Sequence, residues 1–241
     1  MAVAHAPALT VRTRRPGQLR PGPGLPRVGV ARDQRERLLA AVADVSLEVG
    51  LQAATVAQIA ARAGVSKHTL YEHFNDKGEA FLAAHGRAVA RMRGAVNRAF
   101  ISAQGDWPAR VVGALDALLA FLAAEPARAH LCIAEAHLAG RLGARRDQDG
   151  PLDFFGEYLE LAPAEPFTPA PWITAQIVIG GLHEVLYSHI LDGRTRELPT
   201  LLPGLAYSTL APYLGTEAAR EESLPMTPST PEGDPTRSRE G

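Results

Sequence analysis

A run of polar side chains that begins at Lys67 has the composition of a surface that contacts nucleic acid. A lysine can donate to O6 and N7 of guanine, and a threonine can hydrogen-bond to a base or touch the thymine methyl group. Lys67 and Thr69 have these side chains, and His68 between them could also contact a base. Three further residues are suited to phosphate oxygens, namely Tyr71, His73 and Lys77. This chemistry requires one exposed helix face that carries all of these side chains.

The spacing of apolar residues predicts which side chains of this segment point outward. With Leu70 placed at zero and about 100° added per residue, Phe74 falls at about +40° and stays on the inner side. The exposed positions are His68 and Glu72, at about ±160°, and Thr69 and Tyr71, at about ±100°. Lys67 stands in the first turn, where the helix dipole disfavours a cation by about 0.3 to 1 kcal/mol. A nearby phosphate or guanine would reverse that preference.

Two short helices separated by a sharp turn are predicted to hold this surface. Thr55 has the capping-box spacing to Gln58 and starts the first helix, which Gly64 ends. Ser66 caps the second, and the pair 55–74 has the dimensions of a helix-turn-helix, whose second helix enters the major groove of DNA. Asp76 and Glu79 form a further capping box that starts the next helix.

The segment 55–77 closely resembles the helix-turn-helix of the tetracycline-repressor family, TetR/AcrR. It reads Thr-Val-Ala-Gln-Ile-Ala-Ala-Arg from Thr55 and Ala-Gly-Val-Ser-Lys-His-Thr-Leu-Tyr-Glu-His-Phe-Asn-Asp-Lys from Ala63 to Lys77. The resemblance covers roughly residues 32–92. It places the family's DNA-contact positions on Thr55, Ser66, Lys67, His68, Thr69, Tyr71, His73 and Lys77.

Two positions depart from the common pattern of that family. Glu72 replaces an aromatic or basic residue, and Gly78 stands where an acid is common. Glu72 could accept a hydrogen bond from cytosine N4, pair with His68 four residues earlier, or repel phosphate. These alternatives stay open from the sequence.

The composition and periodicity predict an all-α protein. The chain has 42 alanines and only 6% aromatic residues, and its apolar spacing is helical nearly throughout. About nine helices are expected, around 38–49, 55–63, 66–74, 76 onward, 111–122, 131–142, 152–159, 172–191 and 202–213. We predict four regions: a disordered basic arm (1–31), a three-helix helix-turn-helix DNA-binding domain (32–92), a helical ligand-binding and dimerisation domain (93–215) and a disordered tail (216–241).

The charge is distributed unevenly along the chain. Residues 1–77 carry 11 basic and 6 acidic side chains, whereas the remainder carries 14 and 20. The first part is therefore suited to a polyanion. The arm 1–31 has five prolines and five arginines, and could lie along a nucleic-acid backbone, be a solvated leader, or follow from a misplaced start codon.

The segment 172–191 is expected to form a long helix that is apolar on nearly every side. One face would pack on the body and another on a second copy of the chain, with Gly180 and Gly181 allowing close approach. The last helix would complete a four-helix dimer interface, as the resemblance also implies. Candidate ligand-binding residues, chosen as aromatic walls and interrupting polar groups, are Trp107, Phe121, His137, Phe155, Tyr158, Trp172, Gln176 and His183. Packing in the core, or in the dimer seam, is the competing interpretation of each.

Metal binding and catalysis find little support in the sequence. His130 and His137 would lie about 10 Å apart along a helix, too far to share one ion. No nucleophile-elbow, phosphate-loop or dinucleotide motif occurs, and no cofactor is expected. The lone Cys132 favours a reducing cytoplasm, and no segment has 18 apolar residues without a charge.

These observations predict a cytoplasmic, homodimeric transcription regulator that is not an enzyme. It would bind double-stranded operator DNA, most simply as a repressor that an unknown small-molecule effector releases. The alternative is an effector-independent architectural protein that coats DNA through the arm and the same helices.

Overall fold

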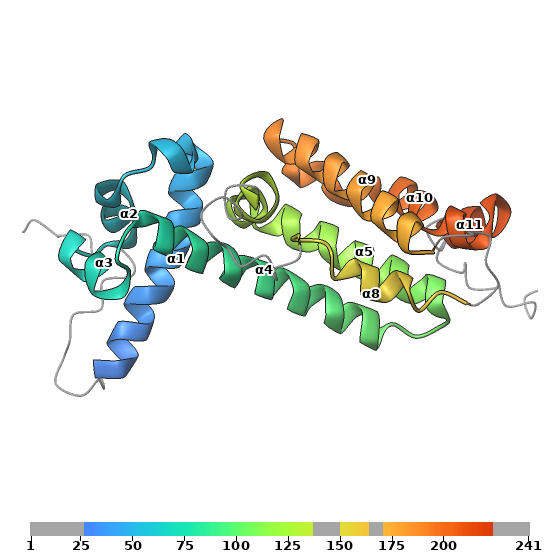
Figure 1. Cartoon of the computed structure of the whole chain (residues 1–241), viewed down its shortest axis with the longest axis horizontal. Coiled ribbons are helices and arrows are strands. Elements are labelled where there is room, and N and C mark those ends of the chain that lie inside the picture. The colour runs from blue at the N-terminus through green and yellow to red at the C-terminus, as the bar shows by residue number, and fades with distance from the viewer. Residues whose placement is uncertain (1–26, 137–149, 164–170, 224–241) are drawn as a thin grey trace, which may run out of the picture. The chain divides into compact units, whose positions relative to one another are not determined.

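The computed structural model describes residues 27–136, 150–163 and 171–223 of the chain, and all elements in these ranges are helical (Figure 1). The all-α prediction is therefore confirmed for the described residues. The chain divides into two compact units, Met1–Ala84 and His85–Gly241. Their boundary falls eight residues before the expected one at 92, within a helix that runs through it.

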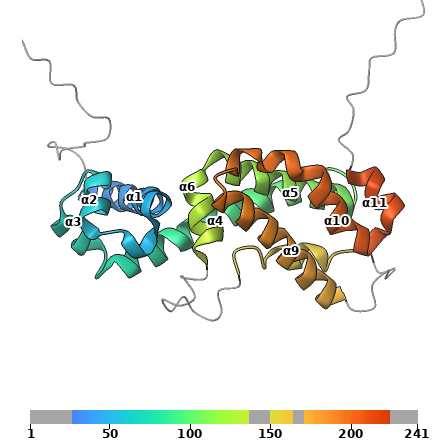
Figure 2. The ribbon, with the colours of Figure 1, turned by 90° about the horizontal axis from the view of Figure 1, so that it is seen from above.

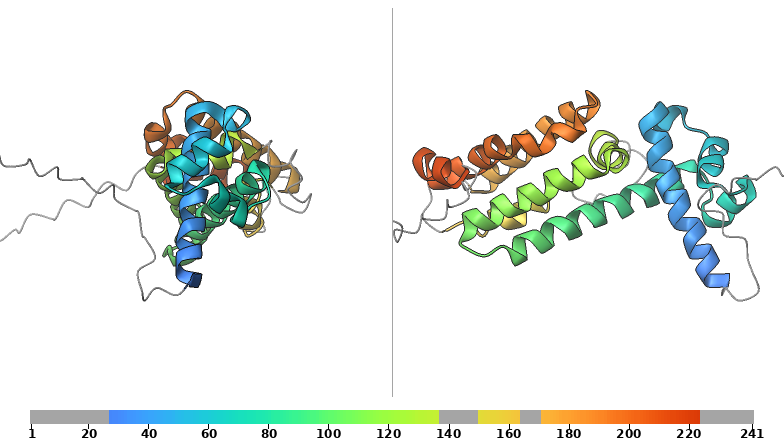
Figure 3. Two further views of the ribbon diagram at one scale, coloured as in Figure 1. Left: turned by 90° about the vertical axis from the view of Figure 1, so that its left-hand side faces the viewer. Right: turned by 180° about the vertical axis from the view of Figure 1, so that it is seen from behind.

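The first unit contains α1 (Arg27–Ala53), α2 (Val56–Ala63), α3 (Lys67–His73) and the first turns of α4 (Lys77–Ser102). Helix α2 packs against both α1 and α3 (Figure 3, right). A kink interrupts α1 at Gly50, where φ is +73°, so the expected stop is present and one further turn follows it. The core of this unit includes the large buried side chains of Leu38, Val42, Ile59, Leu70, Phe74 and Phe81.

The second unit is a helical bundle built around α5 (Trp107–Ala124), which packs against α10 (Leu202–Leu214) and α11 (Thr216–Ser223) (Figure 2). Its other elements are α6 (Pro126–Ala129), a π-helical turn η1 (His130–Ala134), α8 (Phe155–Leu159), α9 (Pro171–Leu191) and a 3-10 segment η2 (Thr195–Leu201). Helix α9 packs against α8, η1 and α10. These pairs position the pocket described below.

Helix α5 is apolar along most of its length because it is the central helix of this unit. Among the helices that the structure describes, it alone has the length and composition to cross a membrane. Leu115, Leu118, Leu119 and Leu122 are completely buried against other elements of the unit. This burial explains the hydropathy of α5 as that of a core helix.

Two segments that were predicted to be disordered are helical in part. Helix α1 begins at Arg27, inside the arm assigned to 1–31, and α11 occupies 216–223 of the tail assigned to 216–241. Ala219 of α11 is fully buried, and α11 contacts α10 and α5. Two alanines, three glutamates and an arginine favour helix, but eight residues are too few for a stable isolated helix, so α11 also depends on its tertiary packing. The rest of both segments lies outside the described residues.

Candidate nucleic-acid interface and effector pocket

The two helices of the predicted helix-turn-helix have defined starts and a defined turn. Thr55 Oγ1 accepts from the backbone N of Gln58 at 3.2 Å, while Gln58 Oε1 accepts from the backbone N of Thr55 at 2.9 Å, so the capping box is complete. Gly64 ends α2 with φ +67°, and its N–H donates to the carbonyl of Ala61 at 3.1 Å. The left-handed backbone at this point turns the chain sharply into α3.

Helix α3 is fixed by its cap and by two buried side chains. Ser66 Oγ accepts from the backbone N of Thr69 at 3.0 Å. Leu70 is 0% exposed and Phe74 is 2% exposed, as the four-residue spacing predicts. The guanidinium of Arg35 in α1 lies 4.7 Å from the Phe74 ring centroid. These contacts orient the opposite face of α3 toward solvent.

That opposite face carries most of the predicted DNA-contacting residues. Lys67 and His68 are exposed, Tyr71 is 54% exposed, and Thr69 is half-buried. His68 Nε2 and Glu72 Oε1 are 3.6 Å apart, which is the i, i+4 pairing considered above. The remaining predicted contacts are Thr55 and Ser66, which are exposed, and His73, which is half-buried. Contact of these residues with DNA remains a prediction.

Lys77 has protein partners that the sequence did not indicate. Its Nζ donates to the carbonyl oxygens of Leu51 at 3.2 Å, Gln52 at 2.9 Å and Ala54 at 2.9 Å. These carbonyls stand at the end of α1 and just after it, where a helix leaves acceptors without intrahelical donors. The ammonium has three N–H donors, and all three are occupied in this arrangement. A phosphate contact by Lys77 would therefore require one of these bonds to be exchanged.

The sequence interpretation also missed two arginines that stabilise α2. Arg37 Nη1 donates to the carbonyl oxygen of Ala63 at 2.8 Å, at the end of α2, while its Nε pairs with Asp33 at 2.9 Å. Arg62 pairs with Glu48 at 2.6 Å. The i, i+4 spacing of Asp33 and Arg37 was a usable signal, whereas the contact with Ala63 joins residues 26 positions apart. Half of the predicted capping box before α4 is present, because Asp76 Oδ1 accepts from Glu79 N at 2.8 Å, whereas Glu79 Oε2 accepts from Asn75 N at 2.7 Å.

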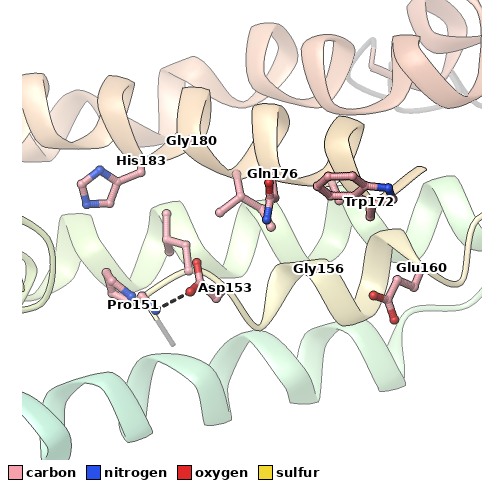
Figure 4. A pocket seen from close by; sticks show the side chains of 12 residues that line it. Pro151, Asp153, Gly156, Glu160, Trp172, Gln176, Gly180 and His183 are labelled. Atoms are coloured by element: carbon pink, nitrogen blue, oxygen red, sulfur yellow. Dashed lines mark hydrogen bonds between the residues drawn. The ribbon is translucent and has the colours of Figure 1, made fainter. Parts of the chain in front are cut away.

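A surface pocket of about 550 Å³ lies in the second unit, between α9 and the segment that leads into and includes α8 (Figure 4). Three of the predicted ligand-binding residues line it: Trp172, Gln176 and His183, all on α9. The facing wall includes Asp153 and Glu160, which the sequence interpretation did not select. Gly150, Pro151, Leu152 and Gly156 also belong to that wall. No pattern in the sequence indicated that this wall would face α9.

The other predicted ligand-binding residues do not line this pocket. Trp107, Phe155 and Tyr158 are buried in the core, where Trp107 Nε1 donates to the Tyr158 carbonyl at 2.7 Å. The Tyr158 ring stacks on Phe100 with centroids 4.1 Å apart. Phe121 is half-buried on α5, and His137 lies outside the described residues. Core packing, the competing interpretation, describes the first three.

Buried polar residues gather around the π-helical turn. The Cys132 thiol is fully buried, and burial raises its pKa to about 12, against a smaller lowering by Arg128. Burial also lowers the pKa of His130 and of His85, which is next to the Cys132 backbone. No group of three His, Cys, Asp or Glu residues able to hold a metal ion occurs within the described ranges. The turn is thus a buried region of the second unit.

Known proteins resemble both parts of the chain. Residues 38–84 match the family described as bacterial regulatory proteins, tetR family. The HTH-type transcriptional activator FasR of Mycolicibacterium smegmatis is 37% identical over 110 residues, which are 45% of this chain and 50% of FasR. This chain thus spans about half the length of that curated relative.

Solved structures share the fold over a larger part of the chain. A TetR-like transcriptional regulator from Rhodococcus sp. RHA1 has a TM-score of 0.60 at 23% identity, covering 78% of this chain and 98% of the other. FadR from Bacillus subtilis, solved in complex with stearoyl-CoA, has a TM-score of 0.55 at 16% identity, covering 75% and 98%. The capped α2–Gly64–α3 arrangement thus lies within the residues that match the tetR family, and the solved structures share the fold of the chain beyond that match.

Proposed function

We propose that the protein is a sequence-specific DNA-binding transcription regulator rather than an enzyme, with α3 as its recognition helix. The observation that carries this proposal is the exposed polar face of α3, held by the buried Leu70 and Phe74 on its other side. Lys67 and His68 would contact base edges, and Tyr71 would contact a phosphate. Helix α3 has the length to lie in a major groove with these residues toward the bases.

Dimerisation belongs to the same proposal. On α9, Ile173 and Ile177 are 41% and 69% exposed, and Gly181 is exposed beyond them. These residues form a strip next to the pocket-lining residues, and an exposed apolar strip of this kind favours a second copy of the chain. A two-fold dimer would place two recognition helices about 34 to 36 Å apart, which is one turn of DNA.

We further propose that the protein is a cytoplasmic repressor, that its second unit binds a small molecule, and that this binding lowers its affinity for operator DNA. The pocket on α9 supports an effector, and its volume is within the range of about 300 to 1,000 Å³ typical of small-molecule sites. Coupling of ordinary strength, about 1 to 3 kcal/mol, would lower DNA affinity about 5- to 150-fold. FasR is named an activator, so transcription with and without the protein must be measured to test whether this chain represses or activates.

Genomic footprinting with the purified full chain tests the DNA-binding proposal. Discrete protected sites with two-fold sequence symmetry are expected, and the affinity for such a site should fall steeply with salt. Sedimentation should show a dimer at micromolar concentration. Continuous coverage with little sequence preference would instead indicate an architectural protein that coats DNA, and absence of protection would overturn both proposals.

A further inference from the structure

The pocket between α8 and α9 has a distinctive charge, which bears on the kind of effector it accepts. Its described lining contains two carboxylates, Asp153 and Glu160, and no lysine or arginine. No hydrogen bond or ion pair partner of the Glu160 side chain lies among the described residues, whereas Asp153 Oδ2 accepts from the backbone N of Gly150. The neighbouring Arg93 is held by Glu157 at 2.7 Å and does not line the pocket.

An aromatic side chain and an amide face these carboxylates. Trp172 is 64% exposed although it lines the pocket, and Gln176 follows one turn later on α9. Figure 4 shows both extending from α9 above the segment that carries Asp153 and Glu160. An exposed indole face attracts a cation, and nearby carboxylates add to that attraction. The pocket therefore combines apolar area with negative charge and a hydrogen-bonding amide.

Among the described lining residues, the beginning of α9 and the imidazole of His183 are the groups that would attract an anion. A helix N-terminus has a partial charge of about +0.5. The two carboxylates contribute a larger charge of opposite sign, so the balance over the described lining is negative. An acyl-CoA, with its several phosphates, would be repelled here.

We propose that this pocket binds an organic cation with an apolar body, such as an aromatic amine, quaternary ammonium or phosphonium compound, and that this is the effector class of the protein. The claim that this cation is the effector rests on the proposed regulatory function, but binding itself is measured without DNA. Glu160 and Asp153 would supply the charge, and Trp172 the cation–π face.

Tetraphenylphosphonium and tetraphenylborate form a matched pair of probes, because they share one shape and differ in the sign of their charge. The chain has two tryptophans, and Trp107 is buried at 8% exposure, so quenching of the exposed Trp172 reports on the pocket. Tetraphenylphosphonium should bind at least tenfold more tightly than tetraphenylborate. Equal or tighter binding of the borate would overturn the proposal.

Two substitutions test whether a carboxylate of the pocket causes the preference for the cation. Glu160→Gln should weaken tetraphenylphosphonium binding about three- to tenfold, which is about 0.6 to 1.4 kcal/mol, without weakening the borate. Asp116→Asn removes an exposed carboxylate of α5 that does not line the pocket, and it should leave both affinities unchanged. Equal effects of the two substitutions would show that only net charge matters, and would contradict a specific site.

Trp172→Phe leaves Trp107 as the sole tryptophan, so the quenching should disappear while calorimetry still detects weakened binding. Persistent quenching would place the cation elsewhere. Stearoyl-CoA should fail to displace tetraphenylphosphonium, and displacement would contradict the inference. If the cation binds as expected but no operator is found by footprinting, the proposed function fails while the cation site stands.

Discussion

The Nζ atom of Lys77 lies 2.9 Å from the carbonyl oxygen of Ala54, the residue immediately before Thr55. Two more hydrogen bonds, to Gln52 and Leu51, join the first residue of α4 to the end of α1. Because Thr55 starts α2, the same lysine fixes the entry into the helix-turn-helix. The geometry favours a positioning role for Lys77 over a direct phosphate contact.

Lys77→Met should lower the free energy of unfolding by about 2 kcal/mol, because two partly buried carbonyl groups and one exposed carbonyl group lose a charged donor. DNA affinity should fall without a change in its salt slope, whereas loss of a phosphate contact would reduce that slope by about 1. Urea unfolding and binding titrations at several salt concentrations measure the two quantities. Lys67→Met, at an exposed position, should leave stability within about 0.5 kcal/mol. Full stability of Lys77→Met with a smaller slope would restore the phosphate assignment.

Leu70→Ala should lower the free energy of unfolding by about 2 to 5 kcal/mol, because Leu70 is fully buried on the inner side of α3. Tyr71→Ala, one residue later and 54% exposed, serves as the control and should cost less than about 1 kcal/mol. Urea denaturation followed by circular dichroism compares them. Similar costs for the two substitutions would mean that the inner and outer faces of α3 are assigned wrongly.

His68→Ala should change which operator sequences are preferred, whereas Tyr71→Phe should weaken binding to all sequences alike. A lost base contact is worth about 1 to 3 kcal/mol of discrimination at one base pair, while a lost phosphate contact has no sequence dependence. Binding selection from randomised DNA measures both effects. A uniform loss for His68→Ala would show that His68 does not read a base.

Cys132 should resist alkylation in the native protein, because its thiol is fully buried and has a pKa of about 12. Iodoacetamide at pH 8 should label it only after unfolding in urea. Mass spectrometry of the intact chain counts the label. Rapid labelling under native conditions would show that η1 opens readily.

The stability of the second unit should fall as the pH is lowered below about 6.5, the ordinary histidine pKa. Burial lowers the pKa of both His85 and His130, so the unfolded chain binds more protons than the folded one in this range. Stability from these groups is therefore complete above the unfolded pKa and is lost as the pH falls toward the folded values. Urea midpoints from pH 8 to pH 5 should decline less for His85→Gln combined with His130→Gln. An identical decline would assign the effect to other groups.

The helix-turn-helix could be predicted from sequence because its determinants are local. Thr55 with Gln58, Gly64, Ser66, and the Leu70–Phe74 spacing each act within four residues, so residue type and position suffice. The described geometry confirms each of these local features. Lys77 shows the limit of that reasoning, since its carbonyl partners are 23 to 26 positions away.

Only the α9 wall of the pocket could be predicted from the sequence. Trp172, Gln176 and His183 recur along one helix, so their common face follows from helical periodicity. Asp153 and Glu160 come from a different segment, and only tertiary packing brings them opposite α9. Large aromatic residues such as Trp107 and Tyr158 were ambiguous for a related reason, because composition does not distinguish a core from a cavity wall.

Gly64 has a consequence for how this protein can evolve. Its backbone has φ +67°, while a side chain added there would meet Arg37 only at an ordinary contact distance of 3.5 Å. The penalty of about 1 to 2 kcal/mol for most other residues would therefore reside in the main chain itself. Trimming a neighbour could not suppress such a mutation, so second-site revertants should raise stability elsewhere in the chain or restore glycine.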